Sequence, residues 1–179
     1  MNHLAESMIG EQQIVRTLTK KQGMYENKAF GVKKMRVSLR EITEDNLVSI
    51  MRLAVDKSQE QFVAHNAWSI AQGTYSELAW FRAIYADDEP VGFVMLELNP
   101  AKPEYYLWRY MIDQNQQGKG YGRQALELVI EFVRQQPSAT QLLLSYVPAD
   151  GSAAPFYTKL GFVETGEVED GENIMKLEL

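Results

Sequence analysis

The stretch Gln116-Gln117-Gly118-Lys119-Gly120-Tyr121-Gly122-Arg123 lies between an extended run, residues 105–113, and an amphipathic run that begins near residue 122. This order predicts a strand, a glycine-rich turn and a helix. The first N–H groups of such a helix have no partner inside the helix, and the positive end of the helix dipole backs them. Glycine lets the backbone turn with positive φ and approach a ligand closely. The stretch therefore predicts a cradle for anions, most often phosphates.

The spacing of the glycines separates three kinds of nucleotide-binding loop. A Walker A loop needs Gly-Lys followed by Ser or Thr, but Gly120 follows Lys119. The dinucleotide pattern G-x-G-x-x-G is absent, and no early strand–helix–strand unit ends in a ribose-binding carboxylate. The pattern that fits is Q/R-x-x-G-x-G/A, formed by Gln117, Gly120 and Gly122. A glycine-rich structural turn is the alternative interpretation of this stretch.

Composition limits the class of protein. A chain of 179 residues with 45% hydrophobic and 23% charged residues is typical of one soluble globular domain. The absence of cysteine excludes disulfides, thiolate metal sites and a cysteine nucleophile. His3 and His65 are too few for a histidine-rich metal site, and no apolar run approaches the roughly 18 residues of a membrane helix. The N-terminus has no secretory apolar segment, so we expect a cytoplasmic enzyme or binding domain without a metal.

Charge divides the chain at Met35. Residues 1–34 contain six Lys or Arg and three Asp or Glu, a balance of +3. Subtracting these from the chain's 18 basic and 24 acidic residues leaves 12 and 21, a balance of −9 for residues 35–179. An acidic surface disfavours nucleic acid and favours cationic partners. We expect residues 1–34 to be a leader or extension, or else a helix that contacts another subunit, and residues 35–179 to be the functional domain.

Periodicity predicts the elements of this domain. Extended patterns predict strands over residues 36–42, 80–85, 91–98, 105–113, 141–147, 163–168 and 173–179, and the strand 141–147 is apolar enough for burial beside a parallel neighbour. Helical spacing predicts helices over residues 44–55, 66–75, 122–136 and 152–161. We expect Thr43 and Asn66 to cap the first two helices. The predicted buried face of the first is Leu47, Ile50, Met51 and Ala54.

A second motif follows the strand 141–147. The run Ser152-Ala153-Ala154-Pro155-Phe156-Tyr157-Thr158-Lys159-Leu160-Gly161-Phe162 predicts a short helix with Pro155 in its first turn and Gly161 after its end. The two motifs, in this order, resemble the general-control-related N-acetyltransferase (GNAT) superfamily over residues 35–179. Within it, the hairpin of residues 83–96 and the strand of residues 105–113 are similar to bacterial spermine/spermidine (diamine) acetyltransferases.

The resemblance implies an α/β (α+β) fold, with a mixed, mostly antiparallel sheet of about seven strands, flanked by four helices and splayed at its central strands. It implies acetyl-coenzyme A as cosubstrate, with its acetyl and pantetheine parts held by the strand residues Tyr110, Met111 and Ile112. The pyrophosphate would lie on Gln117, Gly118, Lys119, Gly120, Tyr121, Gly122 and Arg123. Asp150, which stands where the family often has Asn, and Lys159, a candidate for the 3′-phosphate or simply a solvated lysine, complete the expected coenzyme site.

Acetyl transfer to an amine requires a neutral amine, a donor to the oxyanion and a proton for the leaving thiolate. The resemblance assigns this proton to Tyr157. A thiol with a pKa of about 8.5 is a good enough leaving group for a phenol with a pKa of about 10 to protonate it as charge develops. The alternative for Tyr157 is an aromatic side chain packed on the sheet.

The acceptor is expected to be a polyamine, with other amines as alternatives. Alternation places Glu104, Tyr106 and Trp108 on one face of the strand 105–113, where a carboxylate and two aromatic rings suit an ammonium group. Glu60 and Glu97 are further acidic candidates, and the general base has no assignment. The alternative acceptors are a protein N-terminus or lysine, an aminoglycoside and an amino acid, and a non-catalytic acyl-coenzyme A sensor is the alternative class. We expect no nucleic-acid or membrane partner, and a homodimer remains open.

Overall fold

The computed structural model describes residues 35–179, which form one compact unit. The expectation of a leader falls on residues 1–34, outside the described residues. Along the chain the elements are β1 (Val37–Arg40), α2 (Glu44–Arg52), the 3₁₀ helix η1 (Lys57–Gln59), α3 (Asn66–Thr74), β2 (Ala79–Ala86), β3 (Glu89–Glu97), β4 (Glu104–Ile112), α4 (Tyr121–Arg134), β5 (Gln141–Tyr146), α5 (Ala154–Thr158), β6 (Val163–Glu169) and β7 (Glu172–Glu178).

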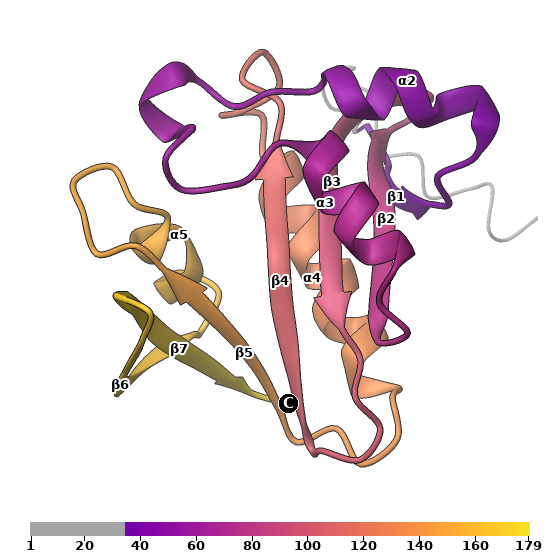
Figure 1. Ribbon diagram of the computed structural model, residues 1–179. Helices are drawn as coiled ribbons and strands as arrows, with labels where there is room; N and C mark the ends of the chain where they lie inside the picture. The colour runs from indigo at the N-terminus through magenta and orange to yellow at the C-terminus, as the bar shows by residue number, and fades with distance from the viewer. Residues whose placement is uncertain (1–34) are drawn as a thin grey trace, which may run out of the picture. The chain divides into compact units, whose positions relative to one another are not determined.

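The strands form one seven-stranded sheet in the order β1-β2-β3-β4-β5-β7-β6. Every neighbouring pair is antiparallel except β4 and β5, which are parallel. Helices α2 and α3 lie over one face of the sheet, and α4 lies over the other (Figure 1). The described residues thus confirm the predicted mixed, mostly antiparallel sheet of seven strands with four α-helices.

The parallel strands separate part-way along their length. β4 pairs with β5 only from Glu104 to Leu107, and beyond that point the two strands diverge (Figure 1). The register between β3 and β4 shifts at the same place, because Leu96 pairs with Leu107 whereas Met95 pairs with Arg109. Trp108 is therefore the extra residue of a β-bulge, which bends and twists its strand. The bulge accompanies the splay that the resemblance implied at the central strands.

Two apolar cores fix the sheet between its helices. The larger core contains the apolar stripe of α4, which the helical spacing predicted: Ala125, Leu126, Val129, Ile130 and Val133 are all buried. The smaller core lies under α2 and α3 and contains Ile50, Phe93 and Met111. Side chains of β4 enter both cores, so this strand is held from both faces up to the edge of the gap.

Two local predictions were wrong. The first helix ends at Arg52, and its buried face contains Ile50, whereas Met51 is 43% exposed, because the chain leaves the helix in an extended conformation at Leu53. Asn66 does not cap α3: His65 is the N-cap, and the buried Asn66 amide donates instead to the carbonyl oxygen of Ile50 at 2.9 Å. This hydrogen bond joins the start of α3 to α2, because a buried amide requires a partner.

Candidate functional site

A cavity of about 660 Å³ lies where β4 and β5 separate. Its wall is formed by the ends of these two strands, the starts of α4 and α5, and the segment around η1. Residues of both apolar cores line it: Tyr110, Ile112 and Tyr157 from the α4 side, and Met111 from the α2–α3 side. The cavity therefore connects the two faces of the sheet through the gap between the parallel strands.

The glycine-rich turn forms one end of this cavity. Gly118 and Gly120 adopt φ values of +75° and +83°, and Gly120 is the N-cap of α4. Gly118, Gly120 and Gly122 all line the cavity, so the turn is open on the side of the cavity. Within residues 35–179, the amide N–H groups from Gly118 to Arg123 find no acceptor. Such a row of free amides at a helix start fits a pyrophosphate group.

Three hydrogen bonds hold the turn in place. The Gln117 side chain donates to the carbonyl oxygen of Ile112 at 3.0 Å and to the Gln59 amide oxygen at 2.9 Å. The Tyr110 hydroxyl donates to the carbonyl oxygen of Gly122 at 2.5 Å, which joins the end of β4 to the start of α4. In the pattern Q-x-x-G-x-G the glutamine side chain therefore holds the turn in position, whereas the glycines leave backbone amides unpaired.

Two cations belong to the turn and the start of α4. Lys119 donates to the Gln116 side chain at 2.7 Å, and Arg123 pairs with Glu127 at 2.9 Å. Both contacts are solvent-exposed, so they are weak enough to be replaced by phosphate oxygens. Arg123 lines the cavity, and Lys119 lies beside it.

The other expected coenzyme residues lie further out. Asp150 and Lys159 are exposed and do not line the cavity. Gly151 and Ser152, next to Asp150, line it in their place. A role for Asp150 or Lys159 remains a prediction for a longer ligand that extends beyond the cavity.

Tyr157 lies on α5 and is 8% exposed. Its ring packs edge to face against Phe156 and Phe162, with centroids 5.3 and 5.7 Å away. Tyr157 lines the cavity, and its hydroxyl makes no hydrogen bond within the described part of the chain. Burial raises the pKa of this phenol, because the apolar surroundings disfavour the phenolate. The group is therefore protonated at neutral pH and has a proton to donate.

The five residues expected to bind the acceptor are spread over the domain, and none lines the cavity. Glu104 is exposed at the far end of β4, and Glu97 pairs with Tyr106 on the neighbouring strand. Trp108 is the bulge residue and packs on the smaller core. Glu60 follows η1, beside a separate small hollow under α3. Their role in acceptor binding stays a prediction.

Several residues of the site had no assignment from the sequence. Phe62 and Val63, in the segment after η1, form part of the cavity wall, and Asp113 anchors the glycine-rich turn. Ser145 also lines the cavity. Its signal in the sequence was a single polar residue in the apolar run Leu142-Leu143-Leu144-Ser145-Tyr146, because a hydroxyl in a buried strand requires a partner.

Within residues 35–179, no group of three or more His, Asp or Glu side chains is arranged to hold a metal ion. None of the helices in the same range has the length and apolar character needed to cross a membrane.

A comparison with models of protein families identifies the family of this chain. The family model described as "Acetyltransferase (GNAT) family" matches residues 36–162, which include the sheet through β5, the glycine-rich turn and Tyr157. The chain belongs to the acetyltransferase (GNAT) family. This GNAT protein is thus an acyltransferase, and the resemblance inferred from the two motifs is confirmed.

Individual proteins are similar to this chain at low sequence identity. The GNAT protein is 27% identical over 154 residues to the spermine/spermidine N(1)-acetyltransferase of Bacillus subtilis (strain 168), covering 81% of this chain and 100% of that protein. Its fold is similar to the acetyltransferase of Salmonella typhimurium that modifies the N-terminal serine of the ribosomal protein L7/L12, with a TM-score of 0.67, 16% identity and coverage of 83% and 98%. It is also similar to the PaiA N-acetyltransferase of Thermoplasma acidophilum in complex with coenzyme A, with a TM-score of 0.59, 18% identity and coverage of 81% and 100%.

Proposed function

We propose that this GNAT protein transfers the acetyl group of acetyl-coenzyme A directly to a primary amine of a small polyamine such as spermidine. One observation carries the proposal: a single cavity joins the open amides of the glycine-rich turn to Tyr157 and reaches both faces of the sheet. A coenzyme that enters from the turn and an amine that enters from the opposite face would meet in the gap. Such positioning of two reactants is a large part of catalysis.

The coenzyme fits the unpaired backbone of this gap. Its pyrophosphate would accept hydrogen bonds from the amides of residues 118–123, with Arg123 close by. Beyond Leu107 the edge of β4 that faces β5 has no ladder partner. Backbone groups of Tyr110 and Ile112 on this edge are therefore available to the amides of pantetheine, apart from the Ile112 carbonyl oxygen, which accepts from the Gln117 side chain. The backbone acts here as a binding surface, because the splay removes a strand from its edge.

The chemistry then assigns Tyr157 the role of acid. The amine nitrogen attacks the thioester carbon, the C–N bond forms and the C–S bond breaks. The phenolic proton of Tyr157 goes to the leaving sulfur. A phenol whose ionised form is disfavoured by burial holds its proton until a thiolate develops next to it.

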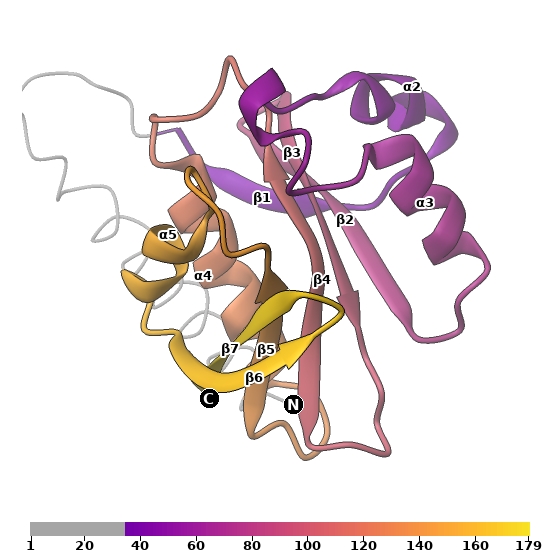
Figure 2. The same cartoon turned by 60° about the vertical axis from the view of Figure 1, so that its left-hand side comes forward.

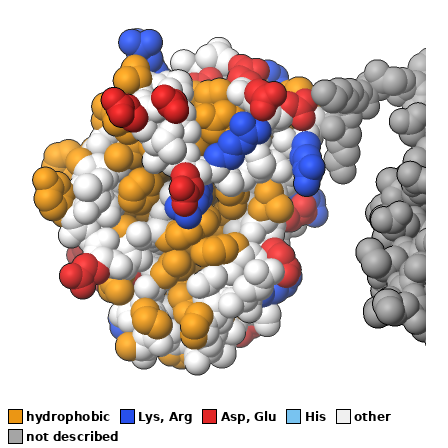
Figure 3. Space-filling view, turned by 90° about the vertical axis from the view of Figure 1, so that its right-hand side faces the viewer, with side chains coloured by type: hydrophobic (Ala, Val, Ile, Leu, Met, Phe, Trp, Pro, Cys, Tyr) orange, Lys and Arg blue, Asp and Glu red, His pale blue; other side chains and the backbone are white. Residues whose placement is uncertain are grey.

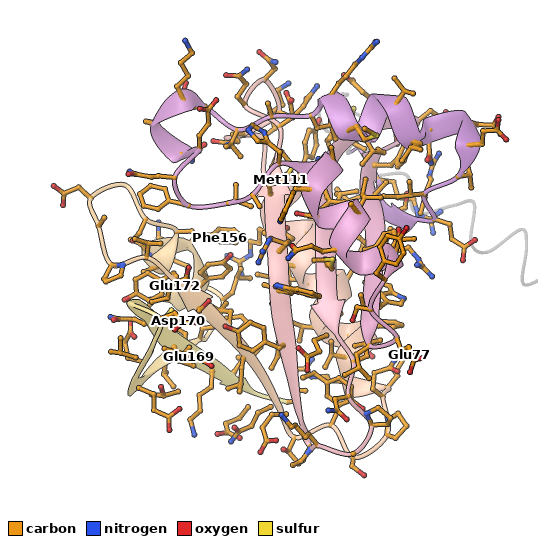
Figure 4. The ribbon with its side chains drawn as sticks, in the orientation of Figure 1. Glu77, Met111, Phe156, Glu169, Asp170 and Glu172 are labelled. Carbon is orange, nitrogen blue, oxygen red and sulfur yellow. The ribbon has the colours of Figure 1, made fainter. Side chains whose placement is uncertain are left out.

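Charge supports a cationic acceptor. Residues 35–179 carry a balance of −9, and the carboxylates of Asp170 and Glu172 lie close together at the β6–β7 end of the sheet (Figure 4). The side of the domain around β1 and α2 carries charges of both signs among exposed apolar groups, so the acidic excess is not concentrated there (Figure 3). The relative from Bacillus subtilis is named for spermine and spermidine.

The test is thiol release from acetyl-coenzyme A across a panel of amines. The panel contains spermidine, spermine, a monoamine of similar length, a lysine-containing peptide, a peptide with a free N-terminus and an aminoglycoside. We expect the highest kcat/KM with a polyamine, and a decrease of that value with salt, because screening acts over about 8 to 10 Å at ordinary ionic strength. Equal rates for polyamine and monoamine without salt dependence would contradict the polyamine assignment. Coenzyme binding by calorimetry without thiol release on any amine would instead favour an acyl-coenzyme A sensor.

A further inference from the structure

The face of the sheet opposite α4 carries a polar row that ends at the cavity. Leu142 and Leu144 of β5 belong to the core under α4, so Ser145 points to the opposite face. Ser145 pairs with Ile174 of β7, and Glu172 lies two residues before Ile174, on the same face. The row therefore runs from β5 to the start of β7, along the side of the gap that an acceptor would enter.

Ser145 and Glu172 are directly connected. The Ser145 hydroxyl donates a hydrogen bond to a carboxylate oxygen of Glu172. Ser145 lines the cavity, whereas Glu172 does not. The serine hydroxyl therefore stands between the cavity and the carboxylate, with Tyr106 as a further hydrogen-bonding neighbour. A hydroxyl oxygen has two acceptor lone pairs, so the Ser145 oxygen has the capacity to accept a hydrogen bond from the cavity side as well.

The charged and titratable groups around this pair come from three elements. Tyr106 and Arg109 face it from β4, and Glu169 and Asp170 come from the end of β6 and the following turn. Burial raises the pKa of the Tyr106 phenol, a side-chain hydrogen bond with Ser145 lowers it, and the carboxylates of Glu172 and Glu169 raise it further. The net shift is upward, so this tyrosine stays neutral beside Ser145. The Arg109 guanidinium donates to the carbonyl oxygen of Trp108 at 2.8 Å and lies at 3.5 Å from the Gln72 side chain. Its charge acts on Glu172 through the gap between the strands without an ion pair in the described structure.

Resting on the proposed function, we propose that Ser145 and Glu172 form the path by which the acceptor amine loses its proton. Ser145 is the catalytic residue of this path, because it reaches the cavity, and Glu172 is a positioning residue that acts through it. As the C–N bond forms, the amine nitrogen passes a proton to the Ser145 oxygen, and the Ser145 proton moves to the Glu172 carboxylate. As the C–S bond breaks, the sulfur takes the proton of Tyr157. Glu172 then releases its proton to solvent and Tyr157 regains one, so no net proton is gained or lost by the protein.

The proton path through Ser145 and the proposed acid Tyr157 lie on opposite faces of the sheet. Tyr157 lies in the core on the α4 side, and Ser145 lies on the opposite face, so the cavity has a proton donor and a proton acceptor on its two sides. A neutral phenol in apolar surroundings is a poor acceptor, which leaves the amine proton to another group. Glu172, by contrast, is half-buried and hydrogen-bonded to a hydroxyl that reaches the cavity.

The experiment compares Glu172→Gln, Ser145→Ala and the control Glu169→Gln. Glu169 is the cross-strand neighbour of Glu172, so its substitution removes the same charge from the same hairpin without touching Ser145. Thiol release is measured with acetyl-coenzyme A and spermidine, or with the best amine of the panel if spermidine is not acetylated. Calorimetry with acetyl-coenzyme A and thermal unfolding are measured on each variant.

We expect Glu172→Gln and Ser145→Ala each to lower kcat about 10²-fold at neutral pH, with KM for acetyl-coenzyme A unchanged. The double variant should lose little more than either single one, because the two residues act as one unit. The deficit should shrink as pH rises, because hydroxide replaces the missing acceptor. Glu169→Gln should stay within about twofold of the wild type in kcat, as expected for a surface charge.

The outcomes separate the two proposals. A wild type that binds acetyl-coenzyme A yet acetylates no amine overturns the proposed function, and this inference with it. A wild type that turns over while Glu172→Gln keeps its kcat at all pH values overturns the inference alone. Equal losses in Glu172→Gln and Glu169→Gln, in KM for the amine only, would also overturn it, since they would indicate electrostatic attraction rather than proton transfer.

Discussion

The Asp113 carboxylate accepts a hydrogen bond from the backbone amide of Ala54 at 3.1 Å, across 59 residues of sequence. Its other oxygen accepts from the backbone and side-chain amides of Asn115 at 3.0 and 3.1 Å. The return contact, from the Gln114 amide to the Ala54 carbonyl oxygen, measures 2.8 Å. These bonds attach the start of the glycine-rich turn to the segment after α2, which carries the cavity residue Val55.

Asp113→Asn should therefore weaken both folding and coenzyme binding. An amide presents a donor where the carboxylate presented an acceptor, so a buried N–H loses its partner, at a cost of about 1 to 3 kcal/mol. Urea unfolding and calorimetry with acetyl-coenzyme A measure the two effects. Asp56→Asn is the matched control, because Asp56 accepts comparable bonds from Ser58 in an exposed turn. An Asp113→Asn variant with wild-type stability and affinity would contradict the anchoring role.

Gly120→Val should abolish binding of acetyl-coenzyme A while the fold survives. The φ of Gly120 is +83°, which a β-branched residue adopts at high cost, and its side chain would keep phosphate oxygens away from the amides of the turn. Gly166→Val is the control, because Gly166 has φ +84° on β6 with open space around its Cβ position. We expect similar losses of thermal stability in both variants and a loss of affinity in one. Equal affinity in the two folded variants would rule out the phosphate cradle.

Tyr157→Phe should lower turnover about 10²- to 10⁴-fold, the usual range for the loss of a general acid, with little change in coenzyme affinity. Only the hydroxyl is removed, so the ring contacts with Phe156 and Phe162 remain. Tyr105→Phe is the matched control, because Tyr105 is also buried but donates to the carbonyl oxygen of Pro137, away from the cavity. Single-turnover thiol release compares the two. Wild-type turnover in Tyr157→Phe would move the acid role to another group.

Alkaline pH should destabilise the domain through its buried tyrosines. Burial raises the pKa values of Tyr157 and Tyr110 above the ordinary value of about 10. Below that value both folded and unfolded chains hold these protons; above it the unfolded chain loses them first and becomes more favourable. The contribution of these two tyrosines to the free energy of unfolding is therefore fully present below about pH 10. Above that pH it falls, by up to about 1.4 kcal/mol per pH unit for each group.

Unfolding free energies between pH 8 and pH 11 measure this slope. Tyr157→Phe should reduce it, because one of the titrating groups is gone. A variant with the same alkaline slope as the wild type would show that Tyr157 ionises in the folded protein, which would contradict a strictly protonated acid.

The sequence by itself determined the local elements and the coenzyme turn. Glycines with positive φ at 118 and 120, the apolar stripe of α4 and the short helix with Tyr157 are local features, because each depends on the conformation of a few neighbouring residues. Extended periodicity also placed the seven strands, and the resemblance to the GNAT superfamily implied the mixed sheet. The predictions for Met51 and Asn66 were wrong because the burial of one side chain and the hydrogen bond of the other depend on the segments that pack against the helix.

Only the tertiary structure decided which residues share the site. Ser145 and Glu172 are 27 residues apart, and their hydrogen bond exists because β7 inserts between β5 and β6 in the sheet (Figure 2). Asp113 and Ala54 meet because the segment after α2 returns to the end of β4. Glu104 and Glu97 have the acidic character that a polyamine requires, but strand direction places Glu104 far from the turn. The charge of a residue can be predicted from sequence, whereas its distance from the cavity depends on strand order and register, which arise from contacts between distant segments.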